Sequence, residues 1–492
     1  MFHDPFVAAL ALIGLVIIAA SLLSGAVERS GAPQVAIFLL LGAMLGPAGL
    51  GVVEFSLESE SLEVLATLAL VLVLFSDAIS VDIGEVREHR RLAVLILGPG
   101  TILPAVVIAV AAWLLLDLPL AGAAILGAAL ASTDPVLLRT LIRSPALPPP
   151  ARLALRLESG INDVILLPVV VLAMVALGQE GASAADVSRR AMGLFVLGPV
   201  LGVGVGYVAI ALLDRVRSRV GVRRDYESLY ALGVAFSAFA AAEAVGGSGF
   251  LAAFAAGLVV AAMDVELCDC FLDYGEASAE MFLLLTFVAF GASVIWSGLQ
   301  VAAGPTLAFA VLALGVRTAV LIPVLRLGDV EPRSRRLIAW LGPRGLSTLL
   351  LALLPVFAGI EGAVGLFQIT CLVVLLSVLV HGAGIAIFLR RSRADSSTVP
   401  ASRGEEPEAL SFGPAPRERK TSPVPEKITI AELRELWDRG EPVSVLDVRT
   451  ERSHRDSAAM AGDAIRMPPD DAVRLARERG LDPNATLVLY CT

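Results

Sequence analysis

Long apolar segments separated by short polar loops fill most of this chain, from residue 6 to residue 389. Most are about 18–25 residues long, close to the length that a helix needs to cross the roughly 30 Å hydrocarbon core of a bilayer. The first lacks a basic flank and a small-residue cleavage site, so we interpret it as a span rather than a signal peptide. The pattern predicts thirteen spans, at 6–23, 33–50, 62–80, 92–115, 119–142, 158–178, 191–213, 226–245, 249–263, 278–297, 302–326, 336–357 and 363–389.

Composition agrees with an all-α polytopic membrane protein. The 492 residues are 57% hydrophobic and 17% charged, whereas soluble domains have about 45–50% apolar and 25% charged residues. The net charge of −9 is spread over the loops and the tail without a basic stripe, which argues against nucleic acid as a partner. Four cysteines do not suggest a disulfide framework.

Arginines in the loops predict the orientation. The loops at 87–91, 139–156, 215–224 and 333–336 are rich in arginine, whereas the loop at 54–60 is acidic. Basic loops stay on the cytoplasmic side, so we expect the N-terminus outside and the C-terminus in the cytosol, in a bacterial cell (inner) membrane. The loop at 264–277 fits this scheme less well, because it is acidic and is expected inside.

The composition changes abruptly after Arg393. Residues 394–426 are rich in Ser, Pro, Glu and Arg, which is typical of a flexible linker. From Lys427 onward, helix-like and strand-like runs alternate. We therefore predict a membrane domain at 1–393, a linker at 394–426 and a small α/β module at 427–492.

The first polar motif inside a predicted span is Ser132-Thr133-Asp134-Pro135. Proline lacks an N–H and disfavours helix at the residue before it, so the span is expected to break at Thr133 and Asp134. A broken helix exposes backbone carbonyls beside the carboxylate, and such breaks mark ion sites in transporters. The alternative is a proline kink with a capping aspartate.

The second motif is Glu158-Ser159-Gly160-Ile161-Asn162-Asp163. On a helix, Ser159 and Asp163 share one face, while Glu158 and Asn162 share the adjacent face. The alternative is a capped helix N-terminus, but the apolar run that follows puts Asp163 within the span or at its edge. A carboxylate in the bilayer costs about 3 kcal/mol unless it has a partner, a proton or a cation. The two motifs together therefore indicate a site where protons and cations compete.

The third motif, Gly342-Pro343-Arg344-Gly345, interrupts another span in the second half of the chain. This span lies seven after the first broken one and runs the opposite way, which is the pattern of an inverted repeat. Arg344 is a candidate ion-pair partner for Glu158. Alternatively, it is an interfacial residue that snorkels to the membrane surface.

These three motifs, in this order, resemble the signature of the electroneutral sodium/proton exchangers of the monovalent cation:proton antiporter superfamily. The resemblance covers residues 5–390. It implies an inverted repeat with two crossed broken helices, and a mobile core bundle that slides against a dimerisation domain in a homodimer. It also implies one-for-one exchange of Na⁺, or K⁺, for H⁺, which serves pH and sodium homeostasis and needs no cofactor.

The resemblance further implies roles for individual residues. Asp163 is implied to bind the proton or the cation, beside Asp134, Thr133 and Ser159, with the metal ion held by Asp163, Ser159 and Thr133. Glu158 and Arg344 are implied to form a structural ion pair.

Three residues complete the implied set. Asn162 stands where electrogenic relatives carry a second acid. Asp77, late in the third span, is a further ion-binding candidate, and Arg317 is a supporting structural residue. Outside this set, we interpret His381 as a satisfied helix residue rather than a pH sensor, and Gly202-x-Gly204-x-Gly206 as a site of close helix packing.

Residues 428–491 resemble the first part of a rhodanese-like domain, through Val445-Leu446-Asp447-Val448-Arg449 and Leu487-Val488-Leu489-Tyr490-Cys491 among other segments. Cys491 takes the position of the nucleophile in that fold. The sequence stops at Thr492, before the loop that would follow, so we expect a transporter rather than an enzyme, without sulfurtransferase activity. The competing interpretation of the whole chain is a cation channel, or a membrane scaffold for this module. A channel is expected to repeat a short filter motif, which the sequence lacks.

Overall fold

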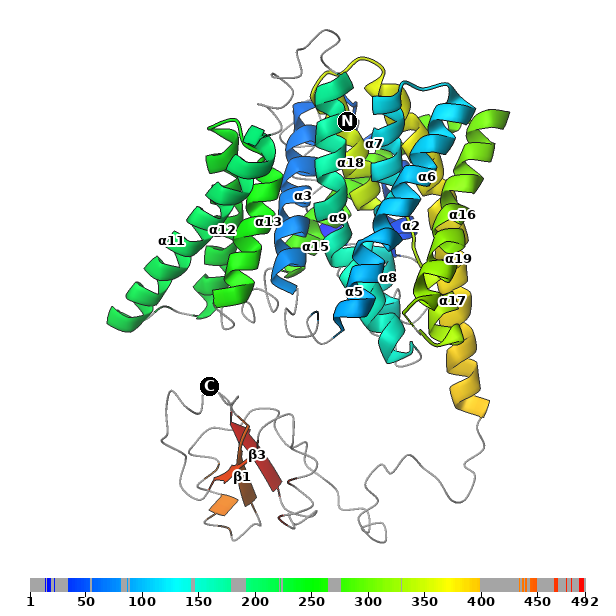
Figure 1. Cartoon of the computed structure of the whole chain (residues 1–492). Helices are drawn as coiled ribbons and strands as arrows, with labels where there is room; N and C mark the ends of the chain where they lie inside the picture. Colours follow the sequence, from blue (N-terminus) through cyan, green and yellow to red (C-terminus); the bar gives the residue numbers. More distant parts are fainter. Residues whose placement is uncertain are drawn as a thin grey trace. The chain divides into compact units, whose positions relative to one another are not determined.

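A computed structural model of the whole chain provides the structure (Figure 1). It describes residues 34–80 except 54, 89–142, 147–177, 192–263 except 221 and 223, 276–398 except 329, the strands of the tail and scattered further positions. Most of the predicted first span, the loop at 264–275 and most of the predicted linker lie outside these residues. The chain divides into two compact units, Met1–Thr398 and Val399–Thr492.

The first unit is a bundle of helices (Figure 1). Helix is expected here because every backbone polar group must find a partner within its own segment when no water is present in the bilayer. The α-helices are α2 (Gln34–Leu45), α3 (Glu60–Ser80), α5 (Arg90–Leu97), α6 (Pro99–Leu116), α7 (Leu120–Ala131), α8 (Pro135–Ile142), α9 (Pro149–Leu177), α11 (Gly198–Arg219), α12 (Arg224–Glu243), α13 (Gly249–Met263), α15 (Glu276–Ala292), α16 (Gly304–Arg326), α17 (Pro332–Trp340), α18 (Leu346–Phe357) and α19 (Ala363–Thr398). A π-helical segment, η1 (Gly193–Leu197), precedes α11, and a 3₁₀ segment, η3 (Val294–Val301), follows α15.

Each predicted span from 33–50 onward contains all or most of at least one of these helices, and the spans at 92–115, 119–142 and 336–357 each contain parts of two. Within the described residues, seven helices are long and apolar enough to cross a membrane, or eight if α15 and η3, which are bent by 48°, count as one span. α9 begins at Pro149, earlier than the predicted 158. The Glu158–Asp163 motif therefore lies inside this helix, and its alternative interpretation as a helix N-terminus is wrong.

Two spans are broken, as the proline motifs predict. The first consists of α7 and α8, with Ser132, Thr133 and Asp134 between them in a non-helical conformation. The second consists of α17 and α18, joined by the non-helical residues 341–345. In each case the break precedes or contains the proline, whose missing N–H and ring weaken the helix at that point.

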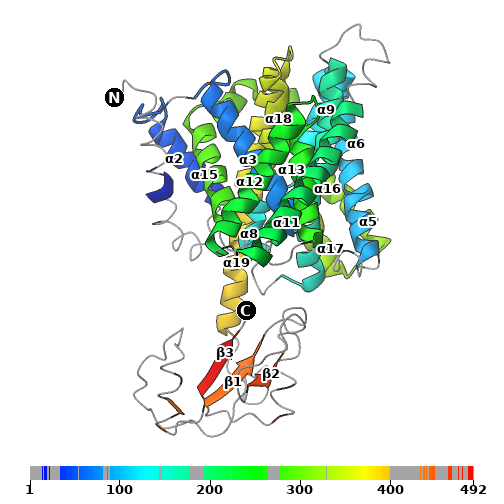
Figure 2. The same cartoon turned by 90° about the vertical axis from the view of Figure 1, so that its left-hand side faces the viewer.

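The helices fall into two groups. α11, α12 and α13 pack against one another and against α3 (Figure 2). Gly202 and Gly206 allow α11 to approach α13 closely, since a Cβ at either would press on Ala252 or Ala256, whereas Gly204 has no atom near it. Close packing is thus confirmed for the first and third glycines.

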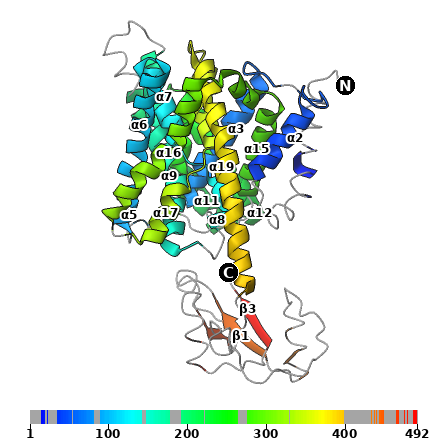
Figure 3. The ribbon, with the colours of Figure 1, turned by 90° about the vertical axis from the view of Figure 1, so that its right-hand side faces the viewer.

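The second group contains the broken spans. α6 packs on α7 and α16, α7 packs on α9, and α18 packs on α19. α19 runs along one face of this group and extends past its neighbours (Figure 3). It continues to Thr398, so the first residues of the predicted linker are helical.

The second unit contains a three-stranded parallel sheet in the order β2-β1-β3. Its strands are β1 (Val443–Asp447), β2 (Ile465–Arg466) and β3 (Thr486–Tyr490). The chain passes from β2 on one side of β1 to β3 on the other, and β1 and β3 come from two of the segments that resemble a rhodanese-like domain. Cys491 lies outside the described residues.

Candidate functional site

The two broken spans touch at their breaks. The backbone N–H of Asp134 donates a hydrogen bond to the carbonyl oxygen of Pro343 over 2.9 Å. This contact joins the first half of the chain to the second at the point where neither span is helical. Four half-helix ends therefore meet inside the bundle, and each presents unpaired backbone groups and a partial charge.

Asp134 satisfies two of these helix ends. Its Oδ1 accepts a 2.7 Å hydrogen bond from the N–H of Val136, at the start of α8. Its Oδ2 accepts a 2.7 Å bond from the N–H of Leu346, at the start of α18. A carboxylate is favourable at a helix N-terminus, where the backbone carries partial positive charge. One aspartate thus caps one half-helix from each broken span.

Arg344 binds a helix C-terminus, whereas Asp134 binds helix N-termini. Its Nη1 donates to the carbonyl oxygens of Ala131 and Ser132, each over 2.8 Å, at the C-terminus of α7. A cation is favourable there, because the helix C-terminus carries partial negative charge. The Nε and Nη2 atoms of Arg344 are buried and have no hydrogen-bond partner among the described residues.

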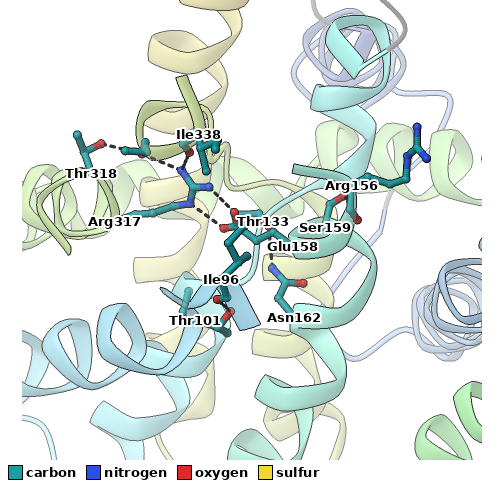
Figure 4. Close-up of polar contacts among 12 residues, drawn as sticks. Ile96, Thr101, Thr133, Arg156, Glu158, Ser159, Asn162, Arg317, Thr318 and Ile338 are labelled. Atoms are coloured by element: carbon teal, nitrogen blue, oxygen red, sulfur yellow. Dashed lines mark hydrogen bonds and ion pairs between the residues drawn. The ribbon is translucent and has the colours of Figure 1, made fainter. Parts of the chain in front are cut away.

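Glu158 pairs with Arg317, not with Arg344, so the predicted Glu158–Arg344 ion pair is wrong. Arg317 Nε lies 2.8 Å from Glu158 Oε1, and Nη2 lies 2.5 Å from Oε2, in a two-pronged pair (Figure 4). Its Nη1 donates to the carbonyl oxygens of Ile338 and Ala339, over 2.6 and 2.7 Å, at the C-terminus of α17. Arg317 on α16 therefore binds both the C-terminus of α17, which is the fourth helix end, and the carboxylate of Glu158.

Arg344 and Arg317 bind different partners because each of them binds the C-terminus of a different half-helix, α7 and α17 respectively. Arg344 lies in the second break, where its guanidinium reaches α7, the half-helix of the other span. Arg317 reaches the Glu158 carboxylate and the C-terminus of α17 from α16, which packs beside α17. Glu158 and Arg317 are almost fully buried, with side chains 5% and 3% exposed.

Asp163 lies beside the first break. The hydroxyl of Ser132 donates to its Oδ1 over 2.5 Å, and the hydroxyl of Ser347, at the start of α18, is also nearby. The side chain is 1% exposed, and its Oδ2 has no hydrogen-bond partner in the described part of the chain. A buried carboxylate oxygen in this position is open to a proton or a cation.

Asn162 contributes a second open oxygen. Its amide nitrogen donates to the hydroxyl of Thr133 over 2.7 Å (Figure 4). Its Oδ1 is buried and, in the described residues, unpaired. Carboxylate, amide and hydroxyl oxygens are the donor atoms that hard cations prefer, so the side chains around the first break fit an alkali cation.

Two more residues that the resemblance implies as ion-binding are Ser159, on α9, and Asp77, on the neighbouring α3. The hydroxyl of Ser159 donates to the carbonyl oxygen of Arg156 in its own helix, over 3.3 Å, and points away from Asn162 and Glu158 (Figure 4). Asp77 lies on α3, and its carbonyl oxygen is 4.0 Å from the place of a Cβ on Gly160. The backbone of Asp77 therefore approaches the middle of α9, one turn from Asp163.

Two side chains of the crossing have roles that the sequence motifs do not predict. Ser132 is the hydroxyl that binds Asp163, although it stood first in the motif that marked the break. Ser377 accepts the backbone N–H of Arg344 over 2.7 Å, and its hydroxyl lies 3.0 Å from Nδ1 of His381. Ser377 carries no sequence signal, because it lies within a long apolar helix.

Comparison with known proteins agrees with this geometry. A family model described as the transmembrane sodium/hydrogen exchanger matches residues 15–391. The K(+)/H(+) antiporter NhaP2 of Shewanella sp. (strain ANA-3) is 27% identical over 397 residues, which are 79% of this chain and 68% of that protein. The Na(+)/H(+) antiporter NhaP of Pseudomonas aeruginosa is 27% identical over 388 residues, 72% of this chain and 88% of that protein. The solved structure of the sodium proton antiporter MjNhaP1 from Methanocaldococcus jannaschii matches with a TM-score of 0.62 at 19% identity, over 78% of this chain and 99% of that one.

Proposed function

The chain belongs to the sodium/hydrogen exchanger family and is a monovalent cation/proton antiporter, and we propose that Asp163 is the group at which cation and proton compete. The observation that carries the proposal is its unpaired, buried carboxylate oxygen beside the break between α7 and α8. The other buried acids of the crossing are already engaged by Arg317 or by helix N-termini.

The charges of the crossing support a one-for-one exchange. Asp134, Glu158 and Asp163 face two guanidinium groups, those of Arg317 and Arg344, and all five side chains are buried. One negative charge is left over. A single proton or a single monovalent cation on Asp163 neutralises this cluster, whereas the empty site keeps an uncompensated buried charge, which is costly. Movement of the empty site across the membrane is therefore disfavoured, and the two ions are exchanged without net charge transfer.

The neighbouring oxygens complete the cation site in this proposal. Asn162 and Thr133 supply an amide and a hydroxyl oxygen, and Ser132 holds the Asp163 carboxylate in place. Asp134 acts mainly by holding the two breaks together. Asp77 and Ser159 come close enough through α3 and α9 to join the site in another conformation of the transporter. The ion is Na⁺ or K⁺, since the relatives are named for either.

The experiment is cation-driven proton flux in proteoliposomes that contain a pH-sensitive dye. Addition of NaCl or KCl outside is expected to drive the cation inward and protons outward, which alkalinises the lumen, with membrane voltage clamped by an ionophore. Asp163→Asn keeps the side-chain volume but removes the titrating group, so exchange should fall to the level of empty liposomes.

A matched control is Asp117→Asn. Asp117 is an exposed acid in the left-handed conformation at the end of α6, which asparagine also adopts readily, and its substitution should leave exchange unchanged. Coupled flux of more than a few per cent in folded Asp163→Asn protein would overturn the assignment of Asp163.

Further features of the proposal concern the rest of the molecule. The arginine distribution supports an external N-terminus and a cytosolic tail, in the cell membrane of a bacterium. A homodimer and an inverted repeat follow from the family resemblance. For the tail we propose a rhodanese-like fold with a regulatory role, and a sulfur-transfer assay with thiosulfate and cyanide tests whether it also transfers sulfur.

A further inference from the structure

A chain of hydrogen bonds ties α19 to the second break. The backbone N–H of Arg344 donates to Ser377 Oγ over 2.7 Å, and Ser377 Oγ lies 3.0 Å from Nδ1 of His381. Ser377 is fully buried and His381 is 5% exposed. The two residues are one helical turn apart, so both can face the break from the same side of α19.

The direction of the hydrogen bond between Ser377 and His381 depends on the tautomer of the imidazole. Ser377 Oγ accepts the Arg344 N–H, and we infer that its own hydrogen is donated to Nδ1 of His381. In this assignment His381 is a neutral imidazole with its hydrogen on Nε2. The imidazole thus orients the Ser377 hydroxyl, and this hydroxyl fixes the backbone of Arg344 by accepting its N–H.

The position of the imidazole is itself constrained. Its ring packs against the indole of Trp340, the last residue of α17, with the ring centroids 5.8 Å apart. The indole also lies on Gly384 of α19, where a Cβ would overlap the Trp340 ring. The imidazole thus sits between the end of α17 and the serine that binds the start of α18.

We propose that His381 and Ser377 are positioning residues for cation binding, which act through Arg344 and Ser132. Arg344 holds the carbonyl oxygens of Ala131 and Ser132, and the hydroxyl of Ser132 holds Asp163. Loss of the serine or of its acceptor frees the backbone at Arg344, and so loosens the residue that orients the cation-binding carboxylate. The inference rests on the proposed role of Asp163.

The test compares variants that keep or lose the acceptor at the Nδ1 position. Ser377→Ala removes the link. His381→Gln extends the amide toward Nε2 and leaves the hydroxyl without its acceptor, whereas His381→Asn puts an amide oxygen near the place of Nδ1. One hydrogen bond lost in each of the first two variants is expected to weaken the apparent affinity for the cation about two- to ten-fold. His381→Asn is expected to stay near wild type.

Two readouts are taken at fixed pH. One is the KM for Na⁺ and for K⁺ in proteoliposome exchange, and the other is the cation concentration that half-maximally raises the melting temperature of the detergent-solubilised protein, with choline chloride as the control salt. The second readout needs no transport, so a failure of the inference can be told apart from a failure of the proposed exchange. KM should rise by more than the maximal rate falls.

Further variants make the result decisive. Leu379→Ala changes an exposed residue of the same helix turn and should leave both readouts unchanged. The double variant Ser377→Ala/His381→Gln should be no worse than Ser377→Ala alone, because both changes break one chain. Wild-type affinity in folded His381→Gln, equal losses in His381→Asn and His381→Gln, or additive losses in the double variant would each overturn the proposal. If Ser377→Ala does not fold, the histidine pair decides alone.

Discussion

The pairing of Glu158 with Arg317 makes a quantitative prediction about stability. Both side chains are buried, and Arg317 uses its Nη1 on two carbonyl oxygens of α17 in addition to the carboxylate. Removal of one partner from a buried ion pair leaves an uncompensated charge, at a cost of about 3–5 kcal/mol. Glu158→Gln should therefore lower the free energy of unfolding by roughly 3 kcal/mol, near the low end of that range because glutamine still offers Arg317 one oxygen.

Arg317→Met should be more severe. It strands the Glu158 carboxylate, and it also leaves the carbonyl oxygens of Ile338 and Ala339 without their donor. Each hydrogen bond to a charged group contributes about 1.5–3 kcal/mol, so the total loss should exceed that of Glu158→Gln by about 2 kcal/mol or more. The double variant Glu158→Gln/Arg317→Met has no stranded charge and should regain about 3 kcal/mol relative to the sum of the single losses.

The assay is denaturation of the purified protein in mixed micelles, followed by the fluorescence of its four tryptophans. The two single variants and their double variant form a double-mutant cycle, which yields the coupling energy between Glu158 and Arg317. A second cycle, with Glu158→Gln and Arg344→Met, gives the coupling energy between Glu158 and Arg344 for comparison, since Arg344 binds α7 rather than Glu158. We expect a much smaller coupling energy in that cycle. A larger coupling for Glu158 with Arg344 than with Arg317 would refute the arrangement described here, as would strictly additive losses in the first cycle.

Three further outcomes are expected. Gly345→Ala should abolish exchange and lower the free energy of unfolding by about 1–3 kcal/mol, because the new methyl group would overlap the Asp134 carboxylate. The control is Gly204→Ala, whose new methyl group meets no atom within 4 Å, and it should leave the free energy of unfolding unchanged in the same denaturation assay. Acidification should lower the apparent cation affinity, because protons and cations need the same oxygen of Asp163, and saturating Na⁺ or K⁺ should restore the rate; inhibition that persists at saturation would indicate a separate proton sensor. Exchange should be insensitive to an imposed membrane potential, since one monovalent charge replaces another, and a current in solid-supported membrane recordings would contradict the one-for-one scheme.

The helical membrane architecture and the places where two of its spans break could be predicted from the amino-acid sequence. These are local properties: an apolar segment of sufficient length has few alternatives to a helix in a bilayer, and Pro135 and Pro343 each lack an N–H and disfavour helix at the residue before them. Proline alone does not decide a break, since Pro104, Pro168, Pro323 and Pro355 lie inside continuous helices. The spacing within α9 is local as well, so the separation of Glu158 and Asn162 from Ser159 followed from helical geometry. The family resemblance rested on these same motifs.

Which side chains contact one another depends on the packing of the helices, and the motifs do not reveal that packing. Several arginines lie on helices near Glu158, and Arg317 is the partner because α16 packs beside α17 and its guanidinium reaches the Glu158 carboxylate. Ser159 and Ser132 are both small hydroxyl residues next to the motif acids, but Ser159 turned to a carbonyl of its own helix while Ser132, freed by the break, reached Asp163. The long side chain of Arg344 finds its partner 212 positions away, at Ser132, and the hydroxyl of Ser132 finds its own 31 positions away, at Asp163. No local pattern records that choice, because it follows from the packing of whole helices.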